Sequence, residues 1–204
     1  TTARRQRQMC IRDSTLSAKG ERVTRGYNPV TSEVLPGDFI NATDEEITDT
    51  VSKSALAFET YRTKTGREKA KFLRAIAEEI ENLGEVLIER CCAESGLPLL
   101  RVKGECGRTT SQLRMFADLI EEGSWVEAVI ENGDSKRSPI PKPDLRRMLV
   151  PLGPVAVFAA SNFPLAFSTA GGDTASALAG GNTVIVKAHS AHPGTSAMIA
   201  EAII

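Results

Sequence analysis

The sequence lacks a charge imbalance and long apolar runs. Its 25 Lys and Arg residues nearly balance its 26 Asp and Glu residues, which leaves a formal net charge of −1. Such a chain offers no electrostatic attraction to nucleic acid or to an anionic membrane surface. No apolar run approaches the ~20 residues that a membrane-spanning helix needs. We therefore expect neither nucleic acid nor a membrane among the partners of this protein.

Cysteine and histidine are scarce. The four cysteines have neither zinc-finger spacing nor the density of a disulfide scaffold, and two histidines alone do not make a metal site. We expect free thiols, a cytoplasmic location and no metal. Cys91 and Cys92 fall in a helical pattern without an accompanying base, so we interpret them as small packing residues and not as nucleophiles.

The common nucleotide-binding motifs are also absent. The first strand–helix turn has no G-x-G-x-x-G pattern, and no G-x-x-x-x-G-K-[ST] occurs anywhere. A standard dinucleotide fingerprint and a P-loop are therefore not expected. What remains is an ordinary globular composition, 41% hydrophobic and 25% charged over 204 residues, which suits one domain or a little more.

The first residues differ from the rest of the chain. The segment from Arg4 to Ser14 is rich in arginine and has no apolar period; it reads RRQRQMCIRDS. A transit peptide and a disordered basic arm are two interpretations. We favour a third, because the string resembles the translated end of a transposon adapter used in DNA sequencing. Residues 1–20 are then a non-native tail, and Cys10 has no biological role.

Residues 21–123 read as a hairpin followed by helices. The stretch from Tyr27 to Thr43 has short alternating runs broken by proline and glycine, which predicts a small hairpin or two edge strands. Thr43 and Glu46 have the spacing of a capping box at the start of a helix. Gly84 and Gly96 mark the ends of two further helices.

A fourth helix is expected from Arg101 to about Glu122. The apolar stripes of these helices predict which residues face the core. They are Phe72, Leu73, Ile76, Ala77 and Ile80 on the second helix, Val86, Leu87 and Cys91 on the third, and Leu113, Phe116, Ala117 and Ile120 on the fourth.

Residues 124–150 change to a period of two. Two alternating runs, 124–130 and 145–150, flank a loop that contains Pro139, Pro141 and Pro143. This pattern predicts two strands and a stiff extended connection, which together leave the domain as an arm. Because such an arm exposes strand edges and apolar side chains, we expect the protein to be a homo-oligomer.

Residues 151–204 read as a strand–helix–strand–helix unit. The strands VAVFAA and NTVIVKA are continuous apolar runs, typical of parallel strands that are buried on both faces. Pro164 marks the expected start of the helix between them, and the glycine pairs 171–172 and 180–181 predict close packing of that helix. Parallel sheets bind ligands at the carboxyl ends of their strands, here 160–162 and 187–189.

One long run carries a family resemblance. It reads PLGPVAVFAASNFPLAFSTAGGDTASALAGGNTVIVKAHSAHPGTS, and it resembles the aldehyde dehydrogenase superfamily. Within the superfamily it is most similar to the branch of α-ketoglutaric semialdehyde (2,5-dioxovalerate) dehydrogenases and NADP-dependent fatty aldehyde dehydrogenases. The resemblance extends back to about Tyr27.

The resemblance implies an α/β fold, the N-terminal part of an aldehyde dehydrogenase. Residues 21–123 are then a helical layer of the cofactor domain, and residues 124–150 a two-stranded bridging arm used for oligomerisation. Residues 151–204 are the first βαβ unit of a Rossmann-like parallel sheet. The adapter-like start and an end within a helix predict a fragment of a longer protein.

The resemblance assigns a role to Asn162. In the family, the Asn before Phe-Pro donates its side-chain amide to the oxygen of an aldehyde that a cysteine thiolate attacks. A hydride then passes to the nicotinamide, and a general base activates water to release the carboxylic acid. Removal of one such oxyanion donor typically costs ~2.7–4 kcal/mol. Because the family's nucleophile and base lie beyond Ile204, we expect residues 1–204 alone to be inactive.

The resemblance also implies a nicotinamide cofactor, bound at Ser161, Lys187, His189 and Ser190. Lys187 looks like the family lysine that contacts the adenosine ribose. NAD-preferring members often carry Glu at the position of Ser190, where a carboxylate repels a 2′-phosphate. A hydroxyl does not, so the sequence favours NADP, or the use of both NADP and NAD.

The start of the last helix adds to the argument for NADP. Helix N-termini offer unpaired N–H groups and a partial positive charge, both of which favour phosphate. Thr195 and Ser196 lie near this start and are expected to add hydroxyl donors.

Three readings of the function follow. The first is an NAD(P)-dependent dehydrogenase that acts on a small-molecule aldehyde, with 2,5-dioxovalerate as one candidate. The second is a non-catalytic nucleotide-binding or oligomerisation module, and the third is an unrelated α/β structural domain. The SNFP run favours the first.

Overall fold

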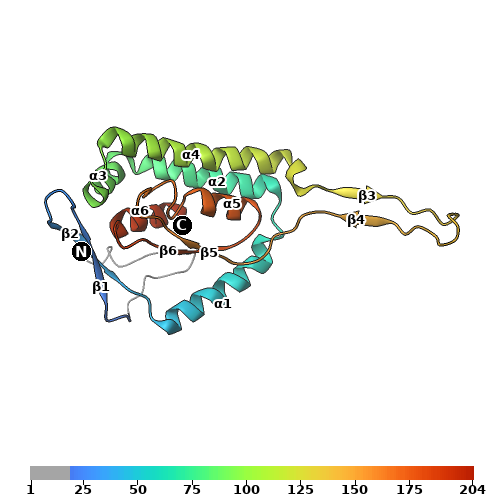
Figure 1. Cartoon of the computed structure of the whole chain (residues 1–204), viewed down its shortest axis with the longest axis horizontal. Helices are drawn as coiled ribbons and strands as arrows, with labels where there is room; N and C mark the ends of the chain where they lie inside the picture. Colours follow the sequence, from blue (N-terminus) through green and yellow to red (C-terminus); the bar gives the residue numbers. More distant parts are fainter. Residues whose placement is uncertain (1–18) are drawn as a thin grey trace.

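The computed structural model describes residues 19–204. A layer of long helices packs against two shorter C-terminal helices, which separate it from a short pair of parallel strands, and a narrow two-stranded arm projects from this body (Figure 1). The predicted α/β fold with a two-stranded arm is confirmed, and the bridging role of the arm stays a prediction. The segment from Arg4 to Ser14 lies outside the described residues, so its interpretation as a tail stays a prediction.

The chain begins with the expected hairpin. Strand β1 (Val23–Tyr27) pairs antiparallel with β2 (Val34–Ile40), so the hairpin starts four residues before Tyr27. The Arg90 guanidinium donates to the Pro36 carbonyl oxygen at 2.7 Å. This bond ties the hairpin to the helical layer.

Two helices begin with capping boxes. Helix α1 (Asp44–Tyr61) has the predicted box at Thr43 and Glu46, and α2 (Gly66–Asn82) has an equivalent box at Thr65 and Glu68. In each box the threonine side chain accepts from the N3 backbone N–H, and the glutamate accepts from the N-cap backbone N–H. Two of the unpaired donors of each helix start are thereby satisfied.

Helices α3 (Gly84–Ser95) and α4 (Leu99–Glu122) both end at a glycine. Gly96 and Gly123 have φ angles of +68° and +87°, which an L side chain rarely adopts. One predicted core position on α3 is wrong: Val86 is 66% exposed, because the buried face of α3 is formed by Leu87, Ile88 and Cys91.

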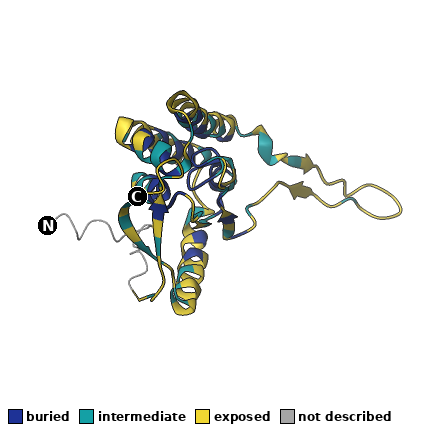
Figure 2. Ribbon diagram, turned by 60° about the vertical axis from the view of Figure 1, so that its left-hand side comes forward, coloured by how far each residue is buried: buried dark blue, intermediate teal, exposed yellow. Residues whose placement is uncertain are grey.

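The core lies between the long helices and the segment 165–203, which contains the two C-terminal helices (Figure 2). Helices α2 and α4 pack side by side, and their facing residues are fully or almost fully buried. The predicted inward residues Leu73, Ile76, Ala77, Ile80, Leu113, Ala117 and Ile120 all belong to this core, with Phe72 and Phe116 packed at its margin.

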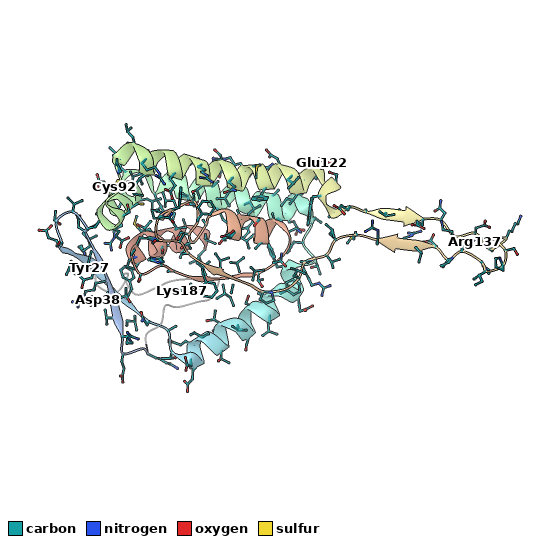
Figure 3. The ribbon with its side chains drawn as sticks, in the orientation of Figure 1. Tyr27, Asp38, Cys92, Glu122, Arg137 and Lys187 are labelled. Carbon is teal, nitrogen blue, oxygen red and sulfur yellow. The ribbon has the colours of Figure 1, made fainter. Side chains whose placement is uncertain are left out.

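The arm is shorter in regular structure than its sequence suggests. The predicted first strand begins as a 3-10 turn, η2 (Ser124–Val126), and only β3 (Val129–Glu131) pairs with β4 (Leu145–Arg147). Glu127 has a positive φ of +50°, which interrupts the extended backbone. The connection beyond the strands reaches Arg137 at the far tip of the molecule (Figure 3).

The last segment forms the predicted parallel unit. Strand β5 (Val155–Phe158) pairs in parallel with β6 (Val184–Lys187), α5 (Gly172–Ala179) connects them, and α6 (Pro193–Ile203) follows. Helix α5 starts at Gly172 and not at Pro164, because residues 164–171 form turns and bends that are bonded to Glu105 of α4.

The prediction that both strands are buried on both faces is wrong for the described residues. Phe158 is 75% exposed, whereas Val157 beside it is buried. Burial on both faces requires a layer on each side of a sheet, and in residues 19–204 this sheet has two strands. Among the helices of the same residues, none has the length and apolar character needed to cross a membrane.

Candidate functional site

The loop that carries Asn162 is anchored on one side and open on the other. The Ala160 backbone N–H, just after β5, donates to the Phe167 carbonyl oxygen at 2.8 Å. Ser161 and Asn162 are exposed, whereas residues 164–166 are buried. The turn therefore presents the Asn162 amide at the surface from a packed base.

A buried carboxylate from the helical layer holds this loop. One side-chain oxygen of Glu105, Oε1, accepts from the backbone N–H groups of Leu165 and Ala166, both at 2.9 Å. Glu105 itself is only 4% exposed. A carboxylate that accepts two backbone donors out of reach of water makes strong charge-assisted bonds. Helix α4 thus fixes the loop two residues after Phe163.

The glycine pair at the start of α5 allows a close backbone approach. A Cβ at Gly171 would collide with the Ala166 carbonyl oxygen, and the Gly172 N–H donates to that same oxygen at 3.0 Å. A Cβ at Gly172 would also lie 3.0 Å from the side-chain oxygen of Gln112 on α4. A close approach is found at Gly171 and Gly172, but its partners are the loop and α4 and not the sheet on which the helix was expected to pack.

Two guanidinium groups of α4 lie over the aromatic side chains of the loop. Arg101 lies 4.7 Å from the Phe163 ring centroid, and Arg108 lies 5.9 Å from the same centroid and 5.1 Å from that of Phe167. The two rings meet edge to face with centroids 5.2 Å apart. Cations are attracted to aromatic faces at such distances.

His192 links the two strand ends from inside. Its side chain is fully buried; Nε2 lies 2.8 Å from the Ala160 carbonyl oxygen and Nδ1 lies 3.3 Å from the Ser196 hydroxyl. Because a carbonyl oxygen only accepts, Nε2 carries a proton. Nothing in the sequence distinguishes this buried histidine from an ordinary polar residue of a loop. In the structure its side chain connects α6 to the start of the Asn162 loop.

The end of β6 offers one cation and one hydroxyl to solvent. Lys187, labelled in Figure 3, and Ser190 are both exposed. Among the described residues no carboxylate pairs with Lys187. His189 stacks on His192 with centroids 5.6 Å apart. Partial burial first, then the neighbouring His192 and Lys187, lower the pKa of His189, so its imidazole is neutral at neutral pH.

The start of α6 does not offer the free donors that the sequence suggested. The Glu94 carboxylate accepts from the N–H groups of Gly194 and Thr195, at 2.8 and 2.7 Å, and from the Thr195 hydroxyl at 2.8 Å. Thr195 and Ser196 are completely buried. The expectation that they donate to a phosphate is wrong, because a carboxylate of α3 already occupies this helix start.

The described thiols fit a packing role. Cys91, Cys92 and Cys106 are free, and Cys91 is buried. Burial, with smaller contributions from Glu105 and Cys92, raises the pKa of Cys91 to about 12. Burial also raises the pKa of Cys92 and Cys106. A thiol that stays protonated at neutral pH is a poor nucleophile, which supports the interpretation of Cys91 and Cys92 as packing residues.

The carboxyl ends of β5 and β6 lie together at one edge of the sheet. The Ala159 N–H donates to the Lys187 carbonyl oxygen at 3.1 Å, which extends the parallel ladder beyond β5. The edge therefore brings together an amide donor, a lysine and a hydroxyl. Within residues 19–204 no group of three or more His, Cys, Asp or Glu side chains could hold a metal ion.

The burial of Glu94 and Glu105 was not predicted, although the sequence contains a signal for it. Glu105 follows Val102 by three positions on the inward stripe of α4, and Glu94 follows Cys91 by three on that of α3. An acid on an apolar stripe is buried only with partners. For His192 no comparable signal exists.

Comparison with known proteins shows the family of the chain. A model of the aldehyde dehydrogenase family matches residues 16–204. The α-ketoglutaric semialdehyde dehydrogenase 2 of Azospirillum brasilense is 56% identical over 147 residues, which is 72% of this chain and 28% of the relative. An α-ketoglutaric semialdehyde dehydrogenase of Acinetobacter baylyi is 49% identical over 165 residues, 81% of this chain and 31% of the relative.

Solved structures agree with these relatives on the fold. A betaine aldehyde dehydrogenase of Staphylococcus aureus, solved with NAD+, is 22% identical and superposes with a TM-score of 0.84 over 97% of this chain and 38% of its own. The HpcC protein of Thermus thermophilus is 26% identical, with a TM-score of 0.82 over 98% of this chain and 38% of its own. The 204 residues thus span about three tenths of the curated relatives. On the match of the family model and the identity to these relatives, the chain belongs to the aldehyde dehydrogenase family.

Proposed function

We propose that the whole protein is an NAD(P)-dependent dehydrogenase that oxidises a small-molecule aldehyde to a carboxylic acid. The observation that carries the proposal is the exposed Asn162 amide on a loop held by Glu105, in a chain of this family. Two relatives at 49% and 56% identity bear the name α-ketoglutaric semialdehyde dehydrogenase, so 2,5-dioxovalerate is the first substrate to test.

The role proposed for Asn162 is to stabilise the negative charge that develops on the aldehyde oxygen. An amide donates a hydrogen bond without titrating, and it remains a donor across the working pH range. The donor stabilises the transition state effectively only if it is fixed before the reaction, because the free energy needed to reorient the loop would offset that stabilisation. The bonds from Leu165 and Ala166 to Glu105 supply that rigidity.

The residues proposed to hold the cofactor are Ser161, Lys187, His189 and Ser190. Exposed Lys187 and Ser190 fit an anionic or ribose group, since one is a cation without a described partner and the other a free hydroxyl at the same strand end. When bound, the nicotinamide accepts a hydride. His189 is neutral and the start of α6 is bound to Glu94, so neither attracts the 2′-phosphate of NADP. The proposal that the protein accepts NADP as well as NAD therefore rests on Lys187 and Ser190.

The proposal includes the domain boundaries of the chain and its assembly into an oligomer. Residues 21–123 and 151–204 are parts of the cofactor domain, and residues 124–150 bridge to another subunit of a homo-oligomer. The exposed apolar side chains of Ile130, Leu145 and Met148 on the arm support this, because isolated apolar arms associate. The cytoplasmic location rests on the unpaired thiols.

The test is the reduction of NADP+ and NAD+ by the whole protein, followed by absorbance, with 2,5-dioxovalerate and a panel of other aldehydes. We expect aldehyde-dependent reduction of both cofactors and formation of the matching acid. Residues 1–204 alone should show none. Cofactor binding without turnover of any aldehyde by the whole protein would instead support a non-catalytic nucleotide-binding module.

A further inference from the structure

Arg101 and Arg108 share one face of α4, next to the loop of Asn162. They are seven residues apart, which is two helical turns or roughly 10 Å along the axis. Both guanidinium groups contact the ring of Phe163, the residue directly after Asn162. Two positive charges therefore lie close to Phe163, the residue next to the proposed oxyanion donor.

The guanidinium groups of both arginines can be reached from solvent. A guanidinium carries its N–H donors in one plane. Both arginines are exposed, so a ligand can approach these donors. A planar edge with two parallel N–H donors is the geometry that binds a carboxylate in a bidentate manner.

The two charges are not equally compensated. Arg101 lies 3.7 Å from the buried Glu105 carboxylate. Arg108 has no carboxylate partner among the described residues. By contrast Arg114, on the same helix, forms a bidentate pair with Glu81 at 2.6 and 2.8 Å. Arg108 is thus an exposed cation in contact with Phe163 and Phe167, beside the Asn162 loop and without a carboxylate partner among the described residues.

From this arrangement we propose that Arg108, assisted by Arg101, binds the carboxylate of an aldehyde substrate that carries one at its far end. The inference rests on the proposed function and names the class of substrate. In 2,5-dioxovalerate four carbon–carbon bonds separate the aldehyde carbon from the carboxylate, a span of roughly 5 Å. Both arginines contact Phe163, the residue next to Asn162, so an aldehyde held at Asn162 has positive charge beside it for such a carboxylate.

The test compares two aldehydes of five carbons with the whole protein. One is 2,5-dioxovalerate, which carries a carboxylate, and the other is pentanal, which carries none. For Arg108→Gln we expect the ratio of their kcat/KM values to fall roughly 10- to 100-fold, because a charge-assisted bond to the carboxylate is lost. The fall should come from a higher KM for the aldehyde that carries the carboxylate. Arg108→Lys should recover part of the ratio, and Arg101→Gln should lower it less than Arg108→Gln.

Arg114→Gln is the matched control and should leave the ratio unchanged, since its guanidinium is bound to Glu81. An unchanged ratio in Arg108→Gln overturns the inference. So does an equal loss on both aldehydes, which would mean that Arg108 only supports Phe163.

A binding measurement separates this inference from the proposed function. α-Ketoglutarate, the acid expected from 2,5-dioxovalerate, is titrated into the wild-type protein and Arg108→Gln by calorimetry. Weaker binding to Arg108→Gln supports the carboxylate subsite even if no aldehyde is oxidised. Equal binding, or none to the wild type, contradicts it whatever the outcome of the activity assay.

Discussion

The interior of the helical layer and the β3–β4 arm differ in how much they are stabilised by contacts within the chain. In the layer, Leu73, Leu113 and Ala117 have no exposed surface, and buried carboxylates satisfy the backbone of neighbouring loops. In the arm, every residue of β4 is exposed and Ile130 on β3 is 65% exposed (Figure 2). The layer is stabilised by its own contacts, whereas the arm gains little from folding unless another surface covers it.

This comparison predicts that substitutions act through different properties in the two regions. Burial of apolar area is the main favourable term in folding. A substitution in the layer therefore changes the free energy of unfolding. One in the arm or at the exposed strand ends changes association or ligand binding and leaves the fold intact.

The largest expected effect is at Leu113 on α4. Leu113→Ala should lower the free energy of unfolding by about 2–5 kcal/mol, because it leaves a cavity between α2 and α4. The measurement is urea unfolding followed by far-UV circular dichroism.

Ile130→Ala on the arm is the matched control and should change the same free energy by less than about 0.5 kcal/mol. Its effect should appear in size-exclusion chromatography, as a shift towards smaller species. If Leu113→Ala and Ile130→Ala lowered the free energy of unfolding equally, the proposed difference between the layer and the arm would be wrong.

The next effect is at Glu105, where the layer meets the Asn162 loop. Glu105→Ala leaves the N–H groups of Leu165 and Ala166 buried without their shared acceptor oxygen, at a total cost of about 1–3 kcal/mol. Glu105→Gln keeps a carbonyl oxygen and should cost less. Glu78→Ala, at an exposed position of α2, is the control. Limited proteolysis of residues 161–171 should accelerate in Glu105→Ala alone; unaltered cleavage would show that Glu105 does not hold the loop.

Much of this layer could be predicted from the sequence. The Thr43–Glu46 box, the stop at Gly96 and the inward residues of α2 and α4 are local signals, and each is confirmed. They succeed because capping and amphipathic periodicity act within a few residues.

The parts that failed depend on contacts between distant segments. Glu94 reaches the start of α6, 100 residues away, and Glu105 reaches the Asn162 loop, 60 residues away. Helix α5 starts at Gly172 because the preceding turns pack on α4, which local propensity at Pro164 does not encode. The site residues Asn162 and Lys187 came from a family resemblance, and no local pattern predicts their roles.

The exposed end of β6 should respond in cofactor choice and not in stability. Ser190→Glu places a carboxylate beside Lys187 and should shift the ratio of kcat/KM for NADP over NAD by about 1–3 kcal/mol towards NAD. The free energy of unfolding should stay within about 0.5 kcal/mol of the wild type. A wild-type protein that strongly prefers NAD, with the ratio unaltered in Ser190→Glu, would place the discriminating groups elsewhere.

The smallest effect is at the start of α2, within the layer but at its surface. The Thr65 backbone N–H, the Thr65 hydroxyl and then Lys64 lower the pKa of Glu68 to about 2, from an ordinary value of 4.5. Because the folded pKa is depressed, this contribution to stability is present above about pH 4.5 and is lost as the pH falls towards 2.

Thr65→Ala should cost about 1 kcal/mol near neutral pH. Glu68→Gln should flatten the dependence of stability on pH across that acidic range. Thr63→Ala, at an exposed position before the cap, serves as the control. An acid-induced loss of the same size in Glu68→Gln and in the wild type would contradict the assignment.

The central claim is that the Asn162 amide stabilises the charge on an aldehyde oxygen. The most direct measurement is kcat for the whole protein and its Asn162→Ala variant, with Asn82→Ala at the exposed end of α2 as the control. The account predicts that Asn162→Ala lowers kcat by roughly 10²- to 10³-fold, while its unfolding curve and the kcat of the control stay at wild-type values. An Asn162→Ala protein that folds normally and retains the wild-type kcat would contradict it.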